Sequence, residues 1–343
     1  MTGLRLVALW CAFALVMPGA ARAQAPKLEK SSIDLAVGGK ALVGYLPLTI
    51  AERRHLFAKA GLDVAIHDFA GGSKALEALM GGSADVVCGA YEHTILMAAK
   101  GIKLTAIALQ NNSYGLVIAL PPARAAAYRS PADLKGLKVG TTGAGSSSAL
   151  GLRLLIAKAG LTEDDLSIIG VGAGAGAAAA MKSSRLDAMA NYDPLMSILQ
   201  RDGALVPVVD TRKQADLEYL YGGPFAGSAF YVRQDFARRN PNTTQAFVNA
   251  IAAAIAWIDQ ASTDEILAEV PQEYYGSDRE LYRVVIERNR PMFSRDGRIS
   301  LAAAATVLRT QASFDETIRD ARIDLTQTFD NSFLDRAVKA GTN

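Results

Sequence analysis

The chain has 343 residues, of which 36 are basic and 34 acidic, and its formal net charge is +2. A charge so close to balance gives no support to a nucleic-acid partner or to a membrane surface bound through bulk charge. The length exceeds the usual size of a single hydrophobic core, so we expect two domains.

The first 23 residues have the pattern of a secretory signal peptide. Arg5 precedes an apolar run over residues 6–17, and Ala21-Arg22-Ala23 is an A-x-A cleavage site. The run is too short for a membrane span, which needs about 20 apolar residues. Cleavage near Ala23 removes two of the basic residues and leaves 34 against 34 acidic ones. We expect an exported, periplasmic protein, without a lipid anchor because Trp10 is too bulky to precede a lipidated Cys11.

Cysteine chemistry is minimal in the exported chain. Cys88 is the one cysteine after residue 23, so no intramolecular disulfide can form. Because it follows two valines, we expect a buried apolar role rather than a reactive thiol.

Strand and helix patterns alternate from residue 33 to residue 109. The stretch 47–61 begins with a proline suited to a first helical turn and ends at a glycine suited to a C-cap, which predicts one helix. Such alternation is typical of a parallel sheet covered by helices on both faces. The other expected elements are strands at 33–37, 62–66, 85–88 and 104–109 and helices at 74–80 and 94–100.

The same alternation restarts after Pro121-Pro122 and predicts a second lobe. Ser130–Asp133 and Thr162–Asp165 have the form of capping boxes, in which a side chain and the backbone at a helix start satisfy one another. From about Phe225 the pattern is mostly helical. The expected elements are strands at 137–139, 167–171, 187–190 and 228–232 and helices at 150–159, 177–186, 242–260, 263–269 and 300–314.

A glycine-rich stretch, G-T-T-G-A-G-S-S-S-A-L, occupies residues 140–150 between a strand and a helix. A Walker loop needs a lysine after its last glycine, and none follows Gly145. A dinucleotide fingerprint, G-x-G-x-x-G, needs three glycines. Gly143 and Gly145 match the first two, but Ser148 stands at the third position. Two interpretations stay open: the N–H groups and hydroxyls of 146–148 bind a carboxylate or sulfonate at the helix start, or they only cap and turn the chain.

Four segments in this order resemble the periplasmic substrate-binding proteins of ABC importers, in the branch for nitrate, sulfonates, taurine and thiamine-pyrimidine precursors. They read Y-L-P-L-T-I-A-E-R-R-H-L-F-A-K-A-G-L-D-V, F-A-G-G-S-K-A-L-E-A-L-M-G-G-S-A-D-V-V, A-D-L-K-G-L-K-V-G-T-T-G-A-G-S-S-S and R-L-D-A-M-A-N-Y-D-P-L. The resemblance implies a two-lobed α/β fold of type II, each lobe a mainly parallel sheet flanked by helices, with two hinge crossings near 113–115 and 224–229. The implied division is a signal peptide at 1–23, lobe 1 at 24–114 plus 225–343, and lobe 2 at 115–224.

The resemblance also implies a ligand cleft between the lobes. Its serines would hold an acidic group, its tyrosines a ring or apolar portion, and its asparagines would orient the ligand. Tyr192 stands where the family commonly has tryptophan, so an aromatic surface is kept and a hydroxyl is added. The implied ligand-binding residues are Tyr45, Gly72, Ser73, Tyr91, Glu92, Asn111, Asn112, Gly145, Ser146, Ser147, Ser148, Tyr192 and Asp193.

Glu92 leaves the chemistry of the ligand open. Its carboxylate can accept hydrogen bonds from an amine or a ring N–H, or it can pair with Lys40 or cap the following helix. His93 is expected at the surface or at the hinge, and Arg153 is expected in solvent.

Three aromatic residues, Tyr114, Tyr221 and Phe225, lie near the predicted crossings. At such positions an aromatic ring either stacks on a ligand or packs the hinge.

Nothing in the sequence favours catalysis. There is no H-E-x-x-H, C-x-x-C or G-x-S-x-G motif, and the three histidines are scattered. We expect no enzyme activity, no metal and no cofactor. The expected function is capture of a small organic anion by closure of the lobes and its delivery to an ABC permease by a monomeric protein. The alternative ligand is a pyrimidine or another amine-bearing or aromatic compound that Glu92 would recognise.

Overall fold

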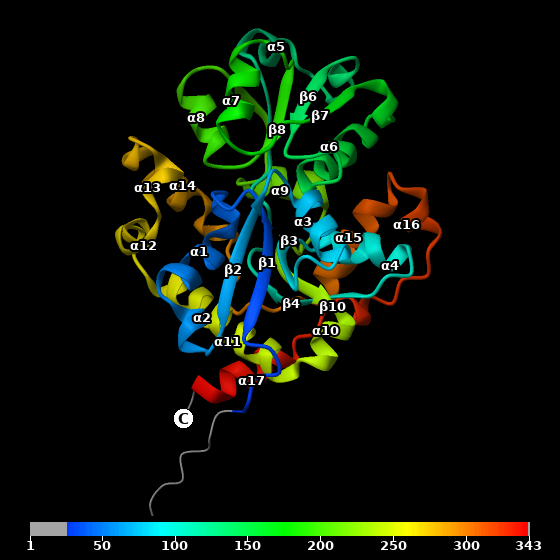
Figure 1. The fold of residues 1–343 in the computed structure, drawn as a ribbon. Coiled ribbons are helices and arrows are strands. Elements are labelled where there is room, and N and C mark those ends of the chain that lie inside the picture. Colours follow the sequence, from blue (N-terminus) through cyan, green and yellow to red (C-terminus); the bar gives the residue numbers. More distant parts are fainter. Residues whose placement is uncertain (1–25, 342–343) are drawn as a thin grey trace, which may run out of the picture.

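The computed structural model describes residues 26–341, so the predicted signal peptide lies outside the described residues. The chain forms two five-stranded sheets, which belong to the lower and the upper part of the molecule in Figure 1. We call the unit built on the lower sheet lobe 1 and the unit built on the upper sheet lobe 2. This is the two-lobed α/β architecture that the sequence predicts.

Lobe 1 has the strand order β2-β1-β3-β10-β4, in which β1 runs parallel to β2 and β3 while β10 is antiparallel to both of its neighbours. Every residue of β3 is buried, as expected for a central strand with helices on both faces. The edge strand β4 is buried as well, and a bridge between Ala106 and Phe329 covers part of its free side. The elements are β1 (Ser32–Gly38), α1 (Leu46–Arg53), α2 (Leu56–Lys59), β2 (Asp63–Phe69), α3 (Gly72–Met80), β3 (Val86–Ala90), α4 (Glu92–Ala99), β4 (Leu104–Leu109) and β10 (Ser228–Arg233).

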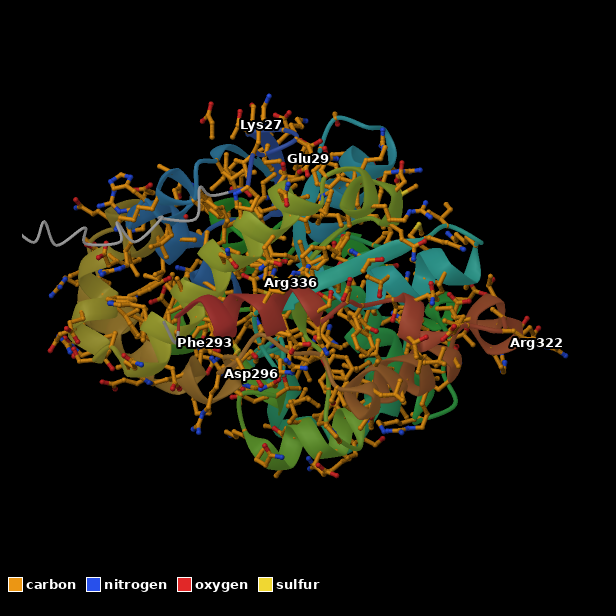
Figure 2. All side chains as sticks on the ribbon, turned by 90° about the horizontal axis from the view of Figure 1, so that it is seen from below. Lys27, Glu29, Phe293, Asp296, Arg322 and Arg336 are labelled. Carbon is orange, nitrogen blue, oxygen red and sulfur yellow. The ribbon has the colours of Figure 1, made fainter. Side chains whose placement is uncertain are left out.

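Helices from the C-terminal third of the chain complete lobe 1. The longest of them, α11, buries an apolar face that includes Phe247, and this ring stacks on Phe57 of α2 with the centroids 5.3 Å apart. Figure 2 shows α17 crossing the underside of the lobe, where Arg336 donates to Gln245 of α11. The helices are α10 (Gln234–Arg239), α11 (Pro241–Gln260), α12 (Thr263–Glu269), α13 (Gln272–Tyr275), α14 (Arg279–Asn289), α15 (Leu301–Ala312), α16 (Glu316–Asp320) and α17 (Ser332–Gly341).

Lobe 2 repeats the strand pattern of lobe 1 with the order β7-β6-β8-β5-β9. Here β5 is the inserted antiparallel strand, just as β10 is in lobe 1. Both strands follow a connection between the lobes. The elements are β5 (Val117–Leu120), α5 (Pro122–Ala127), β6 (Lys138–Thr141), α6 (Ser147–Ala157), β7 (Ser167–Gly170), α7 (Ala175–Lys182), β8 (Ala188–Asn191), α8 (Leu195–Arg201), β9 (Val206–Asp210) and α9 (Gln214–Tyr221).

The structure corrects three local predictions. The helix expected over 47–61 is broken, because His55 adopts a left-handed conformation with φ +55° and separates α1 from α2. The strands β5 and β9 were not expected, and β5 pairs antiparallel with both β8 and β9 in the sheet of lobe 2. Both capping boxes are confirmed, but each opens a single 3-10 turn, at Pro131–Leu134 and Glu163–Asp165.

Two connections join the lobes, one between β4 and β5 and one between α9 and β10. The first contains Gly115 in a left-handed conformation (φ +66°), and a Cβ atom there would lie 2.8 Å from Asn289 Oδ1. Both the backbone angle and the close approach therefore require glycine. Between residues 26 and 341, no helix is long and apolar enough to cross a membrane.

Candidate functional site

The loops that follow β1, β2 and β3 in lobe 1 meet the loops that follow β6 and β8 in lobe 2 (Figure 1). Ligands of open α/β sheets bind outside the carboxyl ends of strands, because helix N-termini and free loop backbone gather there. The meeting of these loops therefore marks the candidate site, and its geometry decides what the site can hold.

The two lobes touch each other directly through these loops. Ser73 N donates to Ser146 Oγ at 3.1 Å, and the same hydroxyl lies 3.3 Å from Ser73 Oγ. Val43 N donates to the carbonyl oxygen of Asp193 at 3.1 Å. The structure thus shows a closed arrangement, in which the N-termini of α3 and α6 face each other.

Gly71 permits this close approach. A Cβ atom at this position would lie 2.6 Å from the carbonyl oxygen of Thr142, on the other lobe. Because both sides of this contact are backbone, neither can move away as a side chain would. Gly72 was predicted as a residue of the cleft. Its neighbour Gly71, which was not predicted, is the glycine that lets the lobes come together.

A buried carboxylate surrounded by aromatic rings lies beside this contact. Glu92, the first residue of α4, is 3% exposed, and Tyr114 Oη donates to its Oε2 at 2.9 Å. The Tyr114 ring lies 6.3 Å from that of Tyr192 and 5.7 Å from that of Phe225, which stacks on Tyr221 at 3.9 Å. We call these five residues the Glu92 cluster.

The carboxyl of Glu92 has little to stabilise its charge. Tyr114 is its one side-chain hydrogen-bond partner among residues 26–341, and Lys40, the predicted alternative partner, pairs instead with Glu52 at 2.7 Å. Burial raises the pKa of Glu92 to about 8, although the hydrogen bond from Tyr114 opposes the shift. A hydrogen-bond donor brought close to this carboxyl would stabilise its ionised form.

His93 was expected at the surface or at the hinge; it is not at the surface but fully buried at the contact between the lobes. Its Nε2 donates to the carbonyl oxygen of Gly145 at 3.3 Å, so Nδ1 accepts from Tyr231 Oη at 2.9 Å. Burial lowers the pKa of His93 to about 4, while the bond to Gly145 opposes the shift. The ring is therefore neutral near pH 7 and ties α4 of lobe 1 to the loop before α6.

The hydroxyls of the serine loop, residues 142–148, are bonded within the protein. Ser146 bonds to Ser73, Ser147 Oγ lies 2.7 Å from Tyr192 Oη, and Ser148 Oγ accepts from Thr142 N at 2.9 Å. None of these bonds caps α6, because Ser146 at its N-cap accepts no hydrogen bond from the backbone of that helix. An anion at the start of α6 would have to rely on backbone N–H groups.

Four of the predicted residues have other surroundings. Tyr91 Oη bonds to Thr328 Oγ1 at 2.5 Å inside lobe 1, and Asn111 spans Gly44 and Ser228 within the same lobe. Asn112 is exposed. Asp193 belongs to a separate buried network that contains an arginine. Tyr45, by contrast, is buried near Tyr192 and contributes to the raised pKa of Tyr192.

The network around Asp193 holds a fully buried ion pair. Arg212 Nη1 donates to Asp193 Oδ2 at 2.9 Å, and Arg212 also forms two 2.7 Å hydrogen bonds to Asp210. Asn289 of lobe 1 donates to the same Asp193 oxygen at 2.7 Å, and Ser197 N donates to the other at 2.9 Å. The carboxylate is thus satisfied by the protein alone, and the bond from Asn289 links it to lobe 1.

The sequence does not indicate Arg212, because no motif surrounds it. Tyr114, Tyr221 and Phe225 were expected near the crossings, where an aromatic ring either stacks on a ligand or packs the hinge. Their closeness to the crossings was the one sequence feature that pointed to the site. Arg153, expected in solvent, is largely covered and donates to the carbonyl oxygen of Ala144 at 2.8 Å. Cys88 is buried, as expected.

An apolar groove of about 730 Å³ lies beside the contact between Val43 and Asp193. Its walls come from both lobes and include Leu42, Phe69, Ala173 and Tyr274. Because both lobes line it, the groove has this form only while the lobes are together.

The fold defines the class of the molecule: a two-lobed protein of the periplasmic binding protein fold. The chain belongs to the NMT1-like family, whose sequence model matches residues 27–271. A solved structure from Bordetella bronchiseptica RB50 is 44% identical and superposes with a TM-score of 0.89, covering 93% of this chain and 100% of that one.

More distant structures share the same fold. The nitrate-binding protein NrtA of Synechocystis PCC 6803 is 18% identical, with a TM-score of 0.72 and coverage of 92% of this chain and 90% of that one. The alkanesulfonate-binding protein SsuA of Xanthomonas axonopodis pv. citri, bound to MOPS, is 22% identical, with a TM-score of 0.65 and coverage of 84% and 92%. These names describe what the relatives bind.

Proposed function

We propose that this protein is the exported, periplasmic solute-binding component of an ABC importer. It acts as a monomer, captures a small organic solute between lobe 1 (24–114 plus 225–343) and lobe 2 (115–224), and delivers it to a membrane permease. Family membership and the direct contact between the lobes support this proposal. Closure is driven by the greater affinity of the closed state for the solute.

The solute proposed is an aromatic or planar compound that carries an amine or a ring N–H. One observation carries this choice: Glu92 is buried between the lobes among aromatic rings and has a single hydrogen-bond donor. A buried carboxylate without enough partners is costly, and an N–H group of the solute would supply the missing donor. The rings of Tyr114 and Tyr192 offer flat surfaces next to it.

A small organic anion, of sulfonate or carboxylate type, is the second candidate. The facing N-termini of α3 and α6 favour it, because their dipoles attract negative charge. Against it stand the serine hydroxyls, which already have partners. Glu92 tolerates an anion only in its protonated form, which its pKa of about 8 favours at neutral pH. The two candidates make opposite demands on Glu92.

A thermal-shift panel on residues 24–343 separates the candidates. The compounds are 2-aminopyrimidine, benzylamine, methanesulfonate, nitrate and benzoate, each tested on the wild-type protein and on Glu92→Gln. A ligand at 100 times its Kd adds about 2.7 kcal/mol of stability. We expect a shift with an N–H compound that Glu92→Gln weakens more than about tenfold. A shift with an anion that is unchanged or larger in Glu92→Gln would support the second candidate, and no shift with any compound would contradict capture of these solutes.

A further inference from the structure

The hydroxyl of Tyr221 has no hydrogen-bond partner among the described residues. Tyr221 is the last residue of α9 and is 3% exposed, so water does not satisfy the hydroxyl from the surface. Buried polar atoms in native proteins are nearly always paired, because leaving one unpaired costs stability. This hydroxyl therefore calls for a physical explanation.

The position of Tyr221 ties it to the proposed site. Its ring stacks on Phe225 with centroids 3.9 Å apart and an interplanar angle of 22°, and Phe225 meets Tyr114 edge to face at 5.7 Å. Tyr114 in turn donates to Glu92. A Cβ atom at Gly151 would lie 3.7 Å from Tyr221 Oη, so the hydroxyl faces α6, the helix that begins at the serine loop.

Tyr221 also lies within electrostatic reach of Glu92. Burial, and after it the Glu92 carboxyl, raise the pKa of Tyr221 well above its ordinary value. The side chain is therefore a neutral phenol at any physiological pH. A neutral phenol has one O–H to donate, and no acceptor among residues 26–341 receives it.

Three other buried tyrosines of this region provide the contrast. Tyr114 donates to Glu92, Tyr192 bonds to Ser147, and Tyr231 donates to His93. Each hydroxyl has a partner in the protein, and each of these tyrosines is braced by that bond. Tyr221 is braced by stacking instead, which holds its ring in place and leaves its hydroxyl available.

We propose that Tyr221 is a specificity-determining residue whose hydroxyl donates a hydrogen bond to an acceptor atom of the captured solute. This inference rests on the proposed function, because it assigns Tyr221 to the same site as Glu92. Glu92 accepts from an N–H group and Tyr221 donates to an acceptor of the same small molecule. The site thus selects planar compounds that carry a donor and an acceptor close together over those that carry a donor alone.

Two neutral probes of similar shape test the assignment. 2-Aminopyrimidine has an amino group flanked by ring nitrogen acceptors, whereas aniline has the amino group without the acceptors. We expect calorimetric titration to show that the wild-type protein binds 2-aminopyrimidine about tenfold more tightly than aniline. In Tyr221→Phe this preference is lost, because 2-aminopyrimidine binding weakens about tenfold while aniline binding stays within twofold.

The ligand-free proteins supply a second readout. Tyr221→Phe removes an unpaired hydroxyl and keeps the stacked ring, so its thermal midpoint stays equal to that of the wild type or rises. The matched control, Tyr192→Phe, loses the bond to Ser147, and its midpoint falls. A fall in Tyr221→Phe as large as that in Tyr192→Phe would show that the hydroxyl is paired in the free protein and would overturn the proposal.

The outcomes separate this inference from the proposed function. Equal binding of both probes by the wild type, with Glu92→Gln still weakening both, would overturn the role of Tyr221 and leave the role of Glu92 intact. Binding of neither probe by the wild type would overturn both, since the N–H solute itself would then be wrong.

Discussion

Asp193 and Glu92 are two carboxylates at the contact between the lobes, and both are almost completely buried, with exposures of 0% and 3%. Asp193 receives hydrogen bonds from Arg212, Asn289 and the backbone of Ser197. Glu92 receives one, from Tyr114. Both acids are buried, but the protein supplies all the donors of Asp193 and only one donor to Glu92, which is why we propose Glu92 and not Asp193 as a ligand contact. The sequence analysis predicted both residues as ligand contacts and could not distinguish between them.

The largest expected effect is on the satisfied acid. Asp193→Ala removes three buried hydrogen bonds, from Arg212, Asn289 and the backbone N–H of Ser197. Arg212 keeps its bonds to Asp210, so we expect the free energy of unfolding to fall by about 3 kcal/mol, about 1 kcal/mol for each bond lost. Urea unfolding measures the loss. The control, Lys74→Ala, removes an exposed pair with Glu77 and changes stability by less than about 0.5 kcal/mol. A loss below about 1 kcal/mol in Asp193→Ala would remove the contrast with Glu92.

The unsatisfied acid gives a pH dependence. Its pKa is about 8 in the folded protein against an ordinary value of 4.5, so the folded state holds the proton more tightly. The resulting stability is complete below pH 4.5 and is lost as the pH rises through 8. Between pH 6.5 and 8 we expect the ligand-free protein to lose about 2 kcal/mol.

Glu92→Gln checks the origin of this pH dependence. Its amide does not titrate, so its unfolding free energy should not fall between pH 6.5 and 8. The pKa of His93 is lowered to about 4 from an ordinary 6.5, which adds roughly 0.4 kcal/mol of stability over the same range in both proteins. An equal fall in both proteins, measured by urea unfolding at several pH values, would assign the effect to another group.

Closure itself is tested at Gly71. In Gly71→Ala the new methyl group meets the carbonyl oxygen of Thr142, and relief of such an overlap costs about 1–3 kcal/mol. We expect a more open molecule in small-angle X-ray scattering and a loss of affinity of about tenfold or more for the panel compound that binds. Gly174→Ala is the control, because a Cβ atom there has open space around it. Unchanged scattering and affinity in Gly71→Ala would contradict the closed contact.

The smallest expected effect distinguishes two serines of the serine loop. Ser146 Oγ bonds across the lobes to Ser73, so Ser146→Ala weakens binding of the panel compound by about 1 kcal/mol with little change in unfolding. Ser148 Oγ bonds within lobe 2, so Ser148→Ala lowers stability and leaves affinity unchanged. Equal effects of the two substitutions on affinity would show that the loop binds the solute directly.

The sequence predicted most of the alternating strands and helices up to residue 190, because burial patterns and caps are local. It did not predict α8, α9 or α14, which lie beyond that point. The two strands that were not predicted, β5 and β9, are short. They pair with each other although they lie far apart in the chain, so no local pattern indicates the pairing. No glycine or proline marks the break between α1 and α2 in the sequence. The left-handed conformation of His55 is therefore visible only in the folded backbone.

The site was predicted as a set of loops, and its chemistry was not. Strand ends identified Ser73, Glu92, Ser146 and Tyr192, which the fold brings together. The direction of a side chain depends on tertiary partners, so the inward turn of Tyr91 toward Thr328 could not be read from its position. For the same reason a hydroxyl without a partner, as in Tyr221, is visible only once every neighbour is known.

A crystal structure of the protein with the panel compound that gives the largest thermal shift tests the central claim most directly. Our account predicts the compound between the lobes, with an N–H group within hydrogen-bonding distance of a Glu92 oxygen and a ring against Tyr114 or Tyr192. A compound held only at the start of α6, with no contact to Glu92, or one bound outside the contact between the lobes, would contradict it.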